Sequence, residues 1–91
     1  MNDCERRENL SFSEALHYLK NFDKVCRVGW NGKGMFLMLV QGSGYRVHVP
    51  VVEGVILPLL PWIGMKTADN CFVPWLASQT DILAEDWMVC P

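Results

Sequence analysis

Apolar residues near the start of the chain recur at the i, i+3, i+4 and i+7 spacing of one helix face: Phe12, Ala15, Leu16 and Leu19. We expect this helix to begin after Ser11 and to end near Asn21. Ser11 and Glu14 have the spacing of a capping box, in which each side chain bonds the other residue's backbone N–H. His17 lies between polar neighbours and is predicted to be a solvated surface residue.

Later segments have the composition and alternation of strands, which predicts strands at 25–28, 35–40, 45–49, 62–67, 71–75 and 87–89. The run at 35–40 is continuously apolar, as in a strand covered on both faces. Residues 68–70 join two of these strands as a hairpin. Residues 41–44 have turn chemistry.

Two segments between the strands have other patterns. Residues 51–61 are apolar but interrupted by proline and glycine, so they are predicted to form a loop. Ser78 and Asp81 repeat the capping spacing, which predicts a short helix that ends near Glu85. The predicted order is helix, three strands, loop, hairpin, short helix and strand. This is an α+β fold: a small antiparallel sheet with an N-terminal helix and a short C-terminal helix.

Composition adds an expectation about assembly. The chain has 91 residues, 51% of them hydrophobic, with four Trp and five Met. A domain of this size cannot bury so much apolar surface within itself, so we expect a homo-oligomer whose interface completes the core. The apolar loop at 51–61 is expected to pack against another subunit. Residues 1–10 are polar and read as a frayed lead-in before a single domain at 11–91.

Charge and cysteine pattern exclude several classes of protein. The formal charge is −2 and no basic run occurs, which argues against DNA or RNA as a partner. The cysteines stand singly and only His17 and His48 accompany them, so no metal site and no cofactor are expected. The first residues do not resemble a signal peptide, and no apolar stretch reaches membrane-spanning length. We therefore expect reduced thiols and an intracellular protein without a membrane.

The glycine-rich turn at 29–36, Gly-Trp-Asn-Gly-Lys-Gly-Met-Phe, has two interpretations. It is either a hairpin turn whose Trp30 covers the core, or a binding loop in which Trp30 stacks on a base. In the second case Arg27 and Lys33 would neutralise phosphates, and the amides of Gly32 and Gly34 would add to the anion site. The turn lacks the Gly-Lys-Ser/Thr end of a Walker motif, so an NTPase is not implied.

The start of the second predicted helix is the other candidate. Its free N–H groups, together with Gln79, Thr80 and Asp81, suit ribose hydroxyls. A catalytic interpretation places Asp81 and Glu85 on one helix face as a carboxylate pair, or pairs Ser78 with the distant His48. Ser78 has no nucleophile-elbow sequence around it, and a solvated helix end explains the acidic residues as well.

Four stretches resemble one family of small phage proteins, the Thoeris anti-defence 2 proteins: 12–15, 29–36, 65–69 and Trp-Leu-Ala-Ser-Gln-Thr-Asp-Ile-Leu-Ala-Glu-Asp-Trp at 75–87. The resemblance covers about residues 11–90, and the last block is the most specific. It implies a protein that binds cyclic ADP-ribose isomers made by TIR-domain sensors, so that the signal never reaches the defence effector. It also implies a homotetramer with nucleotide pockets between subunits, in some members with a separate cyclic dinucleotide site. The apolar stretch at 49–61 varies among members.

By this resemblance, Trp30 and Asn31 face the base and residues 78–81 supply polar contacts. The predicted ligand-binding residues are Arg27, Trp30, Asn31, Gly32, Lys33, Trp75, Ser78, Gln79, Thr80 and Asp81. We expect the protein to sequester glycocyclic ADP-ribose without degrading it, in the cytoplasm of the infected bacterial host. The alternatives are a sponge for cyclic di- or oligonucleotides, an enzyme that opens such a nucleotide with Asp81 or Glu85 as base, and a phage assembly module whose tryptophans serve only interfaces.

Overall fold

The computed structural model describes residues 7–30, 33–48 and 56–91, and within β3 and β4 it describes the backbone only. The elements in chain order are α1 (Phe12–Lys20), β1 (Val25–Arg27), the 3-10 turn η1 (Val28–Trp30), β2 (Phe36–Val40), β3 (Ser43–His48), β4 (Ile56–Leu59), β5 (Trp62–Lys66), β6 (Phe72–Pro74), α2 (Gln79–Leu83) and β7 (Trp87–Val89). The predicted α+β class, both helices and the strand after the second helix are confirmed.

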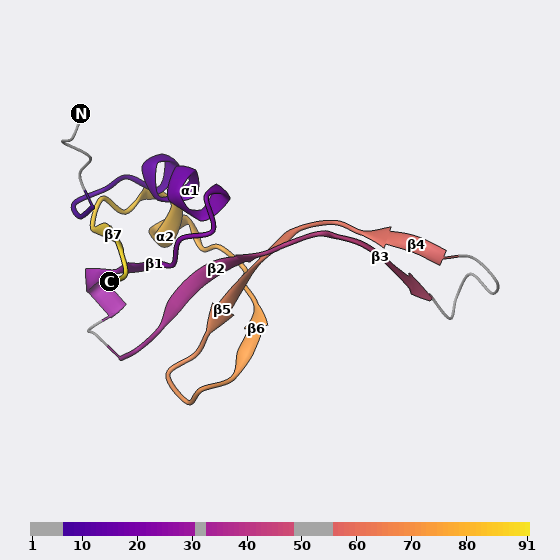
Figure 1. Cartoon of the computed structure of the whole chain (residues 1–91). Coiled ribbons are helices and arrows are strands. Elements are labelled where there is room, and N and C mark those ends of the chain that lie inside the picture. Colours follow the sequence, from indigo (N-terminus) through magenta and orange to yellow (C-terminus); the bar gives the residue numbers. More distant parts are fainter. Residues whose placement is uncertain (1–6, 31–32, 49–55) are drawn as a thin grey trace.

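The strands form two sheets. Five strands make an antiparallel sheet in the order β6-β5-β2-β1-β7, and β3 pairs with β4 in a separate two-stranded ribbon. The sheet is centred on β2, which pairs β1 on one side and β5 on the other. Figure 1 shows the β3–β4 ribbon projecting away from α1, α2 and β7.

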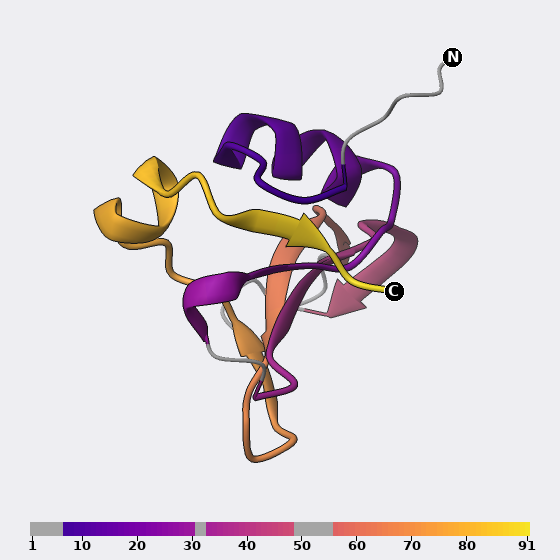
Figure 2. The same ribbon diagram turned by 90° about the vertical axis from the view of Figure 1, so that its left-hand side faces the viewer.

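Helix α1 begins as predicted. The Ser11 hydroxyl accepts the backbone N–H of Glu14 at 3.2 Å, and a Glu14 carboxylate oxygen accepts the N–H of Ser11 at 2.9 Å. The helix buries Ala15, Tyr18 and Leu19 against the sheet. Figure 2 shows it lying over β7 and β1. His17 is exposed, as predicted.

The core is small and includes a residue that the sequence assigned to the lead-in. Its largest fully buried side chains are Trp87, Leu10, Leu19, Leu37 and Val25. Leu10 is bridged to Trp87 by two backbone hydrogen bonds, and the carbonyl of Arg7 accepts the N–H of Val89. The prediction of a frayed segment is therefore wrong for residues 7–10, because this segment covers the β7 edge of the sheet. The rest of the lead-in, 1–6, lies outside the described residues.

The middle of the chain differs from the prediction as well. Residues 43–44, expected in a turn, begin β3, and residues 56–59, expected in a loop, form β4. Pro58 is tolerated because each strand of a two-stranded ribbon has one unpaired edge, where a missing N–H costs little. The ribbon makes the molecule long: its radius of gyration is 15.6 Å, against about 12 Å for a compact chain of this size.

One face of the sheet is open in the single chain. Leu37 is the buried residue of β2, whereas Phe36, Met38 and Val40 are half-buried, so the expectation of a strand covered on both faces is not met within one chain. Trp62 and Phe72 continue this apolar face, with ring centroids 5.8 Å apart. We call these five side chains the open face.

Neither α1 nor α2, the helices of the described part of the chain, has the length and apolar character needed to cross a membrane.

Candidate functional site

Trp87 is the centre of an aromatic cluster. Its side chain is fully buried, and three rings surround it, with centroid distances of 5.3 Å to Phe12, 5.4 Å to Trp30 and 6.1 Å to Trp75. The Trp30 and Trp75 rings meet it nearly edge to face, a favourable arrangement for aromatic quadrupoles. The indole N–H of Trp87 donates to the carbonyl of Asp81 at 2.9 Å, so its polar atom is satisfied within the fold. The cluster therefore joins α1, η1, the segment before α2, and β7.

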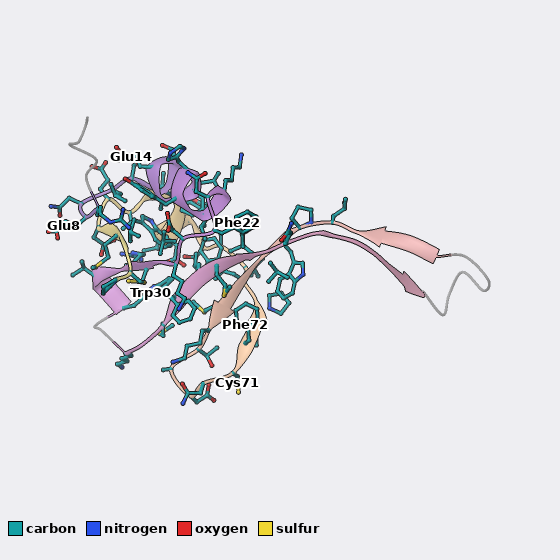
Figure 3. The ribbon with its side chains drawn as sticks, viewed as in Figure 1. Glu8, Glu14, Phe22, Trp30, Cys71 and Phe72 are labelled. Atoms are coloured by element: carbon teal, nitrogen blue, oxygen red, sulfur yellow. The ribbon has the colours of Figure 1, made fainter. Side chains whose placement is uncertain are left out.

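Trp30 is the last residue of η1 and is half-buried. Its ring packs against the core through Trp87, and the remainder of the side chain is accessible. Figure 3 labels Trp30 at the end of the molecule opposite the β3–β4 ribbon. The interpretation in which Trp30 covers the core is therefore confirmed, and the base-stacking role of Trp30 stays a prediction.

Arg27 is held between two carboxylates. Its Nε donates to Asp86 Oδ1 and its Nη1 donates to Asp81 Oδ1, both at 2.8 Å. The other oxygen of Asp86 accepts the N–H of Gly29 at 2.8 Å, one residue before Trp30. We call this arrangement the arginine latch, because it ties α2 and the segment before β7 to β1 and η1. A Cβ at Gly29 would lie 3.1 Å from both Arg27 Nη2 and Asp86 Oδ2, so a larger residue here would push the two latch side chains by a few tenths of an ångström.

The latch changes the pKa values of Arg27 and Asp86. Hydrogen bonds to Asp86 and then to Asp81 raise the pKa of Arg27, which stays charged in any case. The hydrogen bond from Arg27 lowers the pKa of Asp86, and the N–H of Gly29 acts in the same direction against the effect of burial. The guanidinium and two carboxylates carry a formal charge of −1 together. A phosphate at Arg27 would therefore be repelled by both aspartates. Of the two cations predicted to contact phosphates, Lys33 is exposed and would meet no such repulsion from the latch.

Helix α2 is short and begins as the sequence predicts. The Ser78 hydroxyl accepts the N–H of Asp81 at 3.0 Å. The Asp81 carboxylate bonds Arg27 instead of reaching back to Ser78, so the capping is one-sided. The helix ends at Leu83 and Ala84 is extended, so Glu85 lies beyond it. The predicted pair of Asp81 and Glu85 on one helix face is therefore wrong.

The structure gathers part of the predicted site. Arg27, Trp30, Trp75, Ser78 and Asp81 all lie on elements that meet at Trp87. Gln79 and Thr80 are exposed on the first turn of α2. Asn31 and Gly32 lie outside the described residues, as does the side chain of His48.

Sequence reasoning missed three residues of this region: Phe12, Asp86 and Trp87. The helix and strand patterns account for Phe12 and Trp87 without a site role, and Asp86 directly follows the predicted end of the short helix near Glu85. Asp86 is 59 positions from Arg27, a separation at which opposite charges give no pairing signal. Within the described ranges, no group of three or more His, Cys, Asp or Glu side chains has the geometry to hold a metal ion.

Comparison with known proteins gives two findings. Residues 10–90 match the family described as the Thoeris anti-defense 2-like domain. The chain is also 42% identical to a protein of Bacillus phage SP01 named Thoeris anti-defense 2, over an alignment that covers 89% of this chain and 94% of the relative.

Proposed function

This chain belongs to the Thoeris anti-defense 2-like family, and from that premise we propose that it is a phage anti-defence protein that binds and sequesters an immune signalling nucleotide. The proposed ligand is glycocyclic ADP-ribose or a related cyclic ADP-ribose isomer made by TIR-domain proteins. Binding without cleavage in the host cytoplasm would keep the signal from the Thoeris effector. The observation that carries this proposal is Trp30: a rigidly backed indole with accessible surface, on the same cluster as the start of α2.

The polar groups near this cluster suit such a ligand. Trp30 is supported by Trp87 and by the latch that fixes Gly29, so its ring is pre-organised for stacking on a base. Gln79 and Thr80 present side chains on the exposed first turn of α2 and suit ribose hydroxyls. A sponge must bind at sub-micromolar concentration, which requires more than about 8 kcal/mol. One base stack contributes roughly 1–3 kcal/mol, so several further contacts are needed.

We propose that a second copy of the chain supplies some of those contacts, in a homotetramer with pockets between subunits. The open face supports an oligomer, because its five large apolar side chains, four half-buried and one exposed, lie on one side of the sheet and would gain burial from a second copy. Exposed Leu76, just before α2, and exposed Leu83, at its end, add apolar surface on either side of the helix. Light scattering on purified protein measures the assembly directly.

We propose that the protein does not cleave its ligand. The Asp81 carboxylate, the base of the enzymatic alternative that lies in the described cluster, already accepts from Arg27 Nη1 at 2.8 Å, so this oxygen is held inside the fold and is not directed at a ligand. The protein should be mixed with glycocyclic ADP-ribose, denatured, and the released nucleotide identified by mass spectrometry. Intact ligand is expected. A hydrolysed or linearised product would instead support the enzymatic alternative.

The stacking role of Trp30 has its own test. We expect Trp30→Ala to lose nucleotide binding, measured by calorimetry, while the oligomer persists in light scattering. Phe22→Ala is the control, because Phe22 is 57% exposed at the end of α1 and its removal should leave binding unchanged. Normal binding by Trp30→Ala would refute the stacking role. Cyclic dinucleotides in the same titration test the alternative ligand class, and the absence of binding to any cyclic nucleotide would favour an assembly module.

A further inference from the structure

Two thiols face each other across the edge of the sheet, far from each other in the sequence. Cys26 lies in β1, opposite Met88 in the register of β1 and β7. Cys90 follows β7 two positions after Met88, so alternation places both cysteines on the same face of the pair. The Cys90 thiol donates a hydrogen bond to Cys26 Sγ at 3.3 Å. The backbone N–H of Cys90 also donates to the carbonyl of Lys24 at 2.8 Å, which holds the strand end in place.

This separation is close to that of a disulfide. An S–S bond is about 2.05 Å long, so the two sulfurs need to approach by only ~1.2 Å. Both side chains are partly buried, and both are free thiols in the structure. Cys71, the other free cysteine of the described residues, is exposed in the turn region between β5 and β6, where Figure 3 shows it at the tip of that hairpin. Cys71 therefore serves as an isolated thiol with which the Cys26–Cys90 pair can be compared.

We propose that Cys26 and Cys90 form a reversible disulfide that joins β1 to the end of β7 when a low-molecular-weight disulfide is available as oxidant. One cysteine thiolate attacks a sulfur of oxidised glutathione and releases a first glutathione thiolate. The other cysteine then loses its proton, attacks the protein sulfur of the mixed disulfide and releases a second glutathione thiolate. The two cysteine sulfurs are oxidised, one glutathione disulfide is reduced to two thiols, and the protein gains no atoms.

The hydrogen bond suggests the order of the two attacks. Cys90 is the donor of the contact, so its proton lies between the two sulfurs. Burial, followed by this hydrogen bond, raises the pKa of Cys90 to about 12. Cys90 is therefore the resolving thiol, which acts once Cys26 carries glutathione. Since the second step occurs between groups already in contact, it should be much faster than the first.

The test uses a chain in which Cys4→Ser and Cys71→Ser leave only the proposed pair. Folded protein is treated with oxidised glutathione, quenched with acid and analysed by intact mass. The expected product is a single chain that has lost two hydrogens, carries no glutathione and recovers its thiols with dithiothreitol. Adding Cys26→Ser or Cys90→Ser should prevent this product and leave a mixed disulfide or a free thiol.

Two further measurements keep the outcome decisive. The same reaction in urea removes the native contact and should accumulate the glutathione adduct. Proteolytic mapping of the oxidised wild-type chain, alkylated before digestion, should yield a Cys26–Cys90 linked peptide, which covers the case of a variant that does not fold. Accumulation of glutathione adducts on the folded chain, disulfides between chains, or equal closure with and without urea would each overturn the proposal.

Discussion

The arginine latch is the feature whose removal has the clearest predicted effect. Arg27→Met keeps the aliphatic stem of the side chain but deletes the guanidinium, so Asp81 and Asp86 lose their common partner. The side chains of Arg27 and Asp81 are each 16% exposed and that of Asp86 is 33% exposed, so solvent compensates only in part. The two carboxylates would then repel each other across the vacated position.

The size of the effect lies between two limits. A fully buried pair that loses one partner costs about 3–5 kcal/mol, whereas a surface pair contributes about 0–1 kcal/mol. The intermediate exposure and the two hydrogen bonds of 2.8 Å place the loss at about 2 kcal/mol. For a domain of this size, that lowers the thermal midpoint by roughly 8–16 °C. Thermal unfolding followed by circular dichroism at fixed protein concentration measures it.

Two variants test the reasoning behind this number. Lys20→Met removes the same charge from an exposed position at the end of α1, and its midpoint should stay close to that of the wild type. Adding Asp81→Asn and Asp86→Asn to Arg27→Met removes the repelling charges and should restore part of the lost stability. If Arg27→Met unfolds like Lys20→Met, or if the added substitutions destabilise further by the same amount again, the latch does not act as described.

The remaining predictions concern acid and helix capping. The pKa of Asp86 is lowered in the folded state, so the folded state binds fewer protons than the unfolded state does. The stabilisation that ionised Asp86 gives to the folded state is therefore complete above the unfolded value of 3.8 and is lost as the pH falls through the folded value. The thermal midpoint should therefore fall as the pH is lowered below about 4, and less so in Asp86→Asn; equal slopes for both proteins would contradict this. Ser11→Ala removes a complete capping box and should cost about 1 kcal/mol, visible as a lower thermal midpoint. Ser78→Ala loosens the start of the five-residue helix α2, where the proposed ligand contacts lie. It should therefore weaken nucleotide binding more than Ser11→Ala does. The reverse order would argue against a ligand role for α2.

Local patterns were enough to predict much of the fold. The capping box at Ser11, the helical spacing after it and the hairpin around residues 68–70 are signals within a few residues of one another, and each is confirmed. The helix cap at Ser78 was found in the same way. Such features depend on backbone hydrogen bonds that are completed by residues a few positions away, so the sequence alone can predict them.

The features that failed depend on contacts between distant segments. β4 forms because residues 56–59 pair with β3, and the proline within it hides that pairing from any local rule. Leu10 is buried because it bridges Trp87, and Asp86 belongs to the site because the fold places it beside Arg27. Of the proposed binding residues, the sequence identified the aromatic and polar types but not that Arg27 and Asp81 are bonded to each other.

The strand pairing of the β3–β4 ribbon separates length changes within the ribbon from those that would shift the register of β2 and β5. Val40 pairs Trp62 and Ser43 pairs Leu59, three steps along each strand, so β2–β3 and β4–β5 keep one register through the junction of the two sheets. Beyond it, Ser43 and Arg46 are three positions apart although their partners Leu59 and Pro58 are adjacent, so β3 already holds two unmatched residues. The irregularity lies outside the sheet that carries Trp30 and the latch. Insertions or deletions in the ribbon beyond the Ser43–Leu59 pair therefore change the length of the ribbon without changing which side chains of β2 and β5 face α1. The length of the ribbon can thus evolve independently of the core.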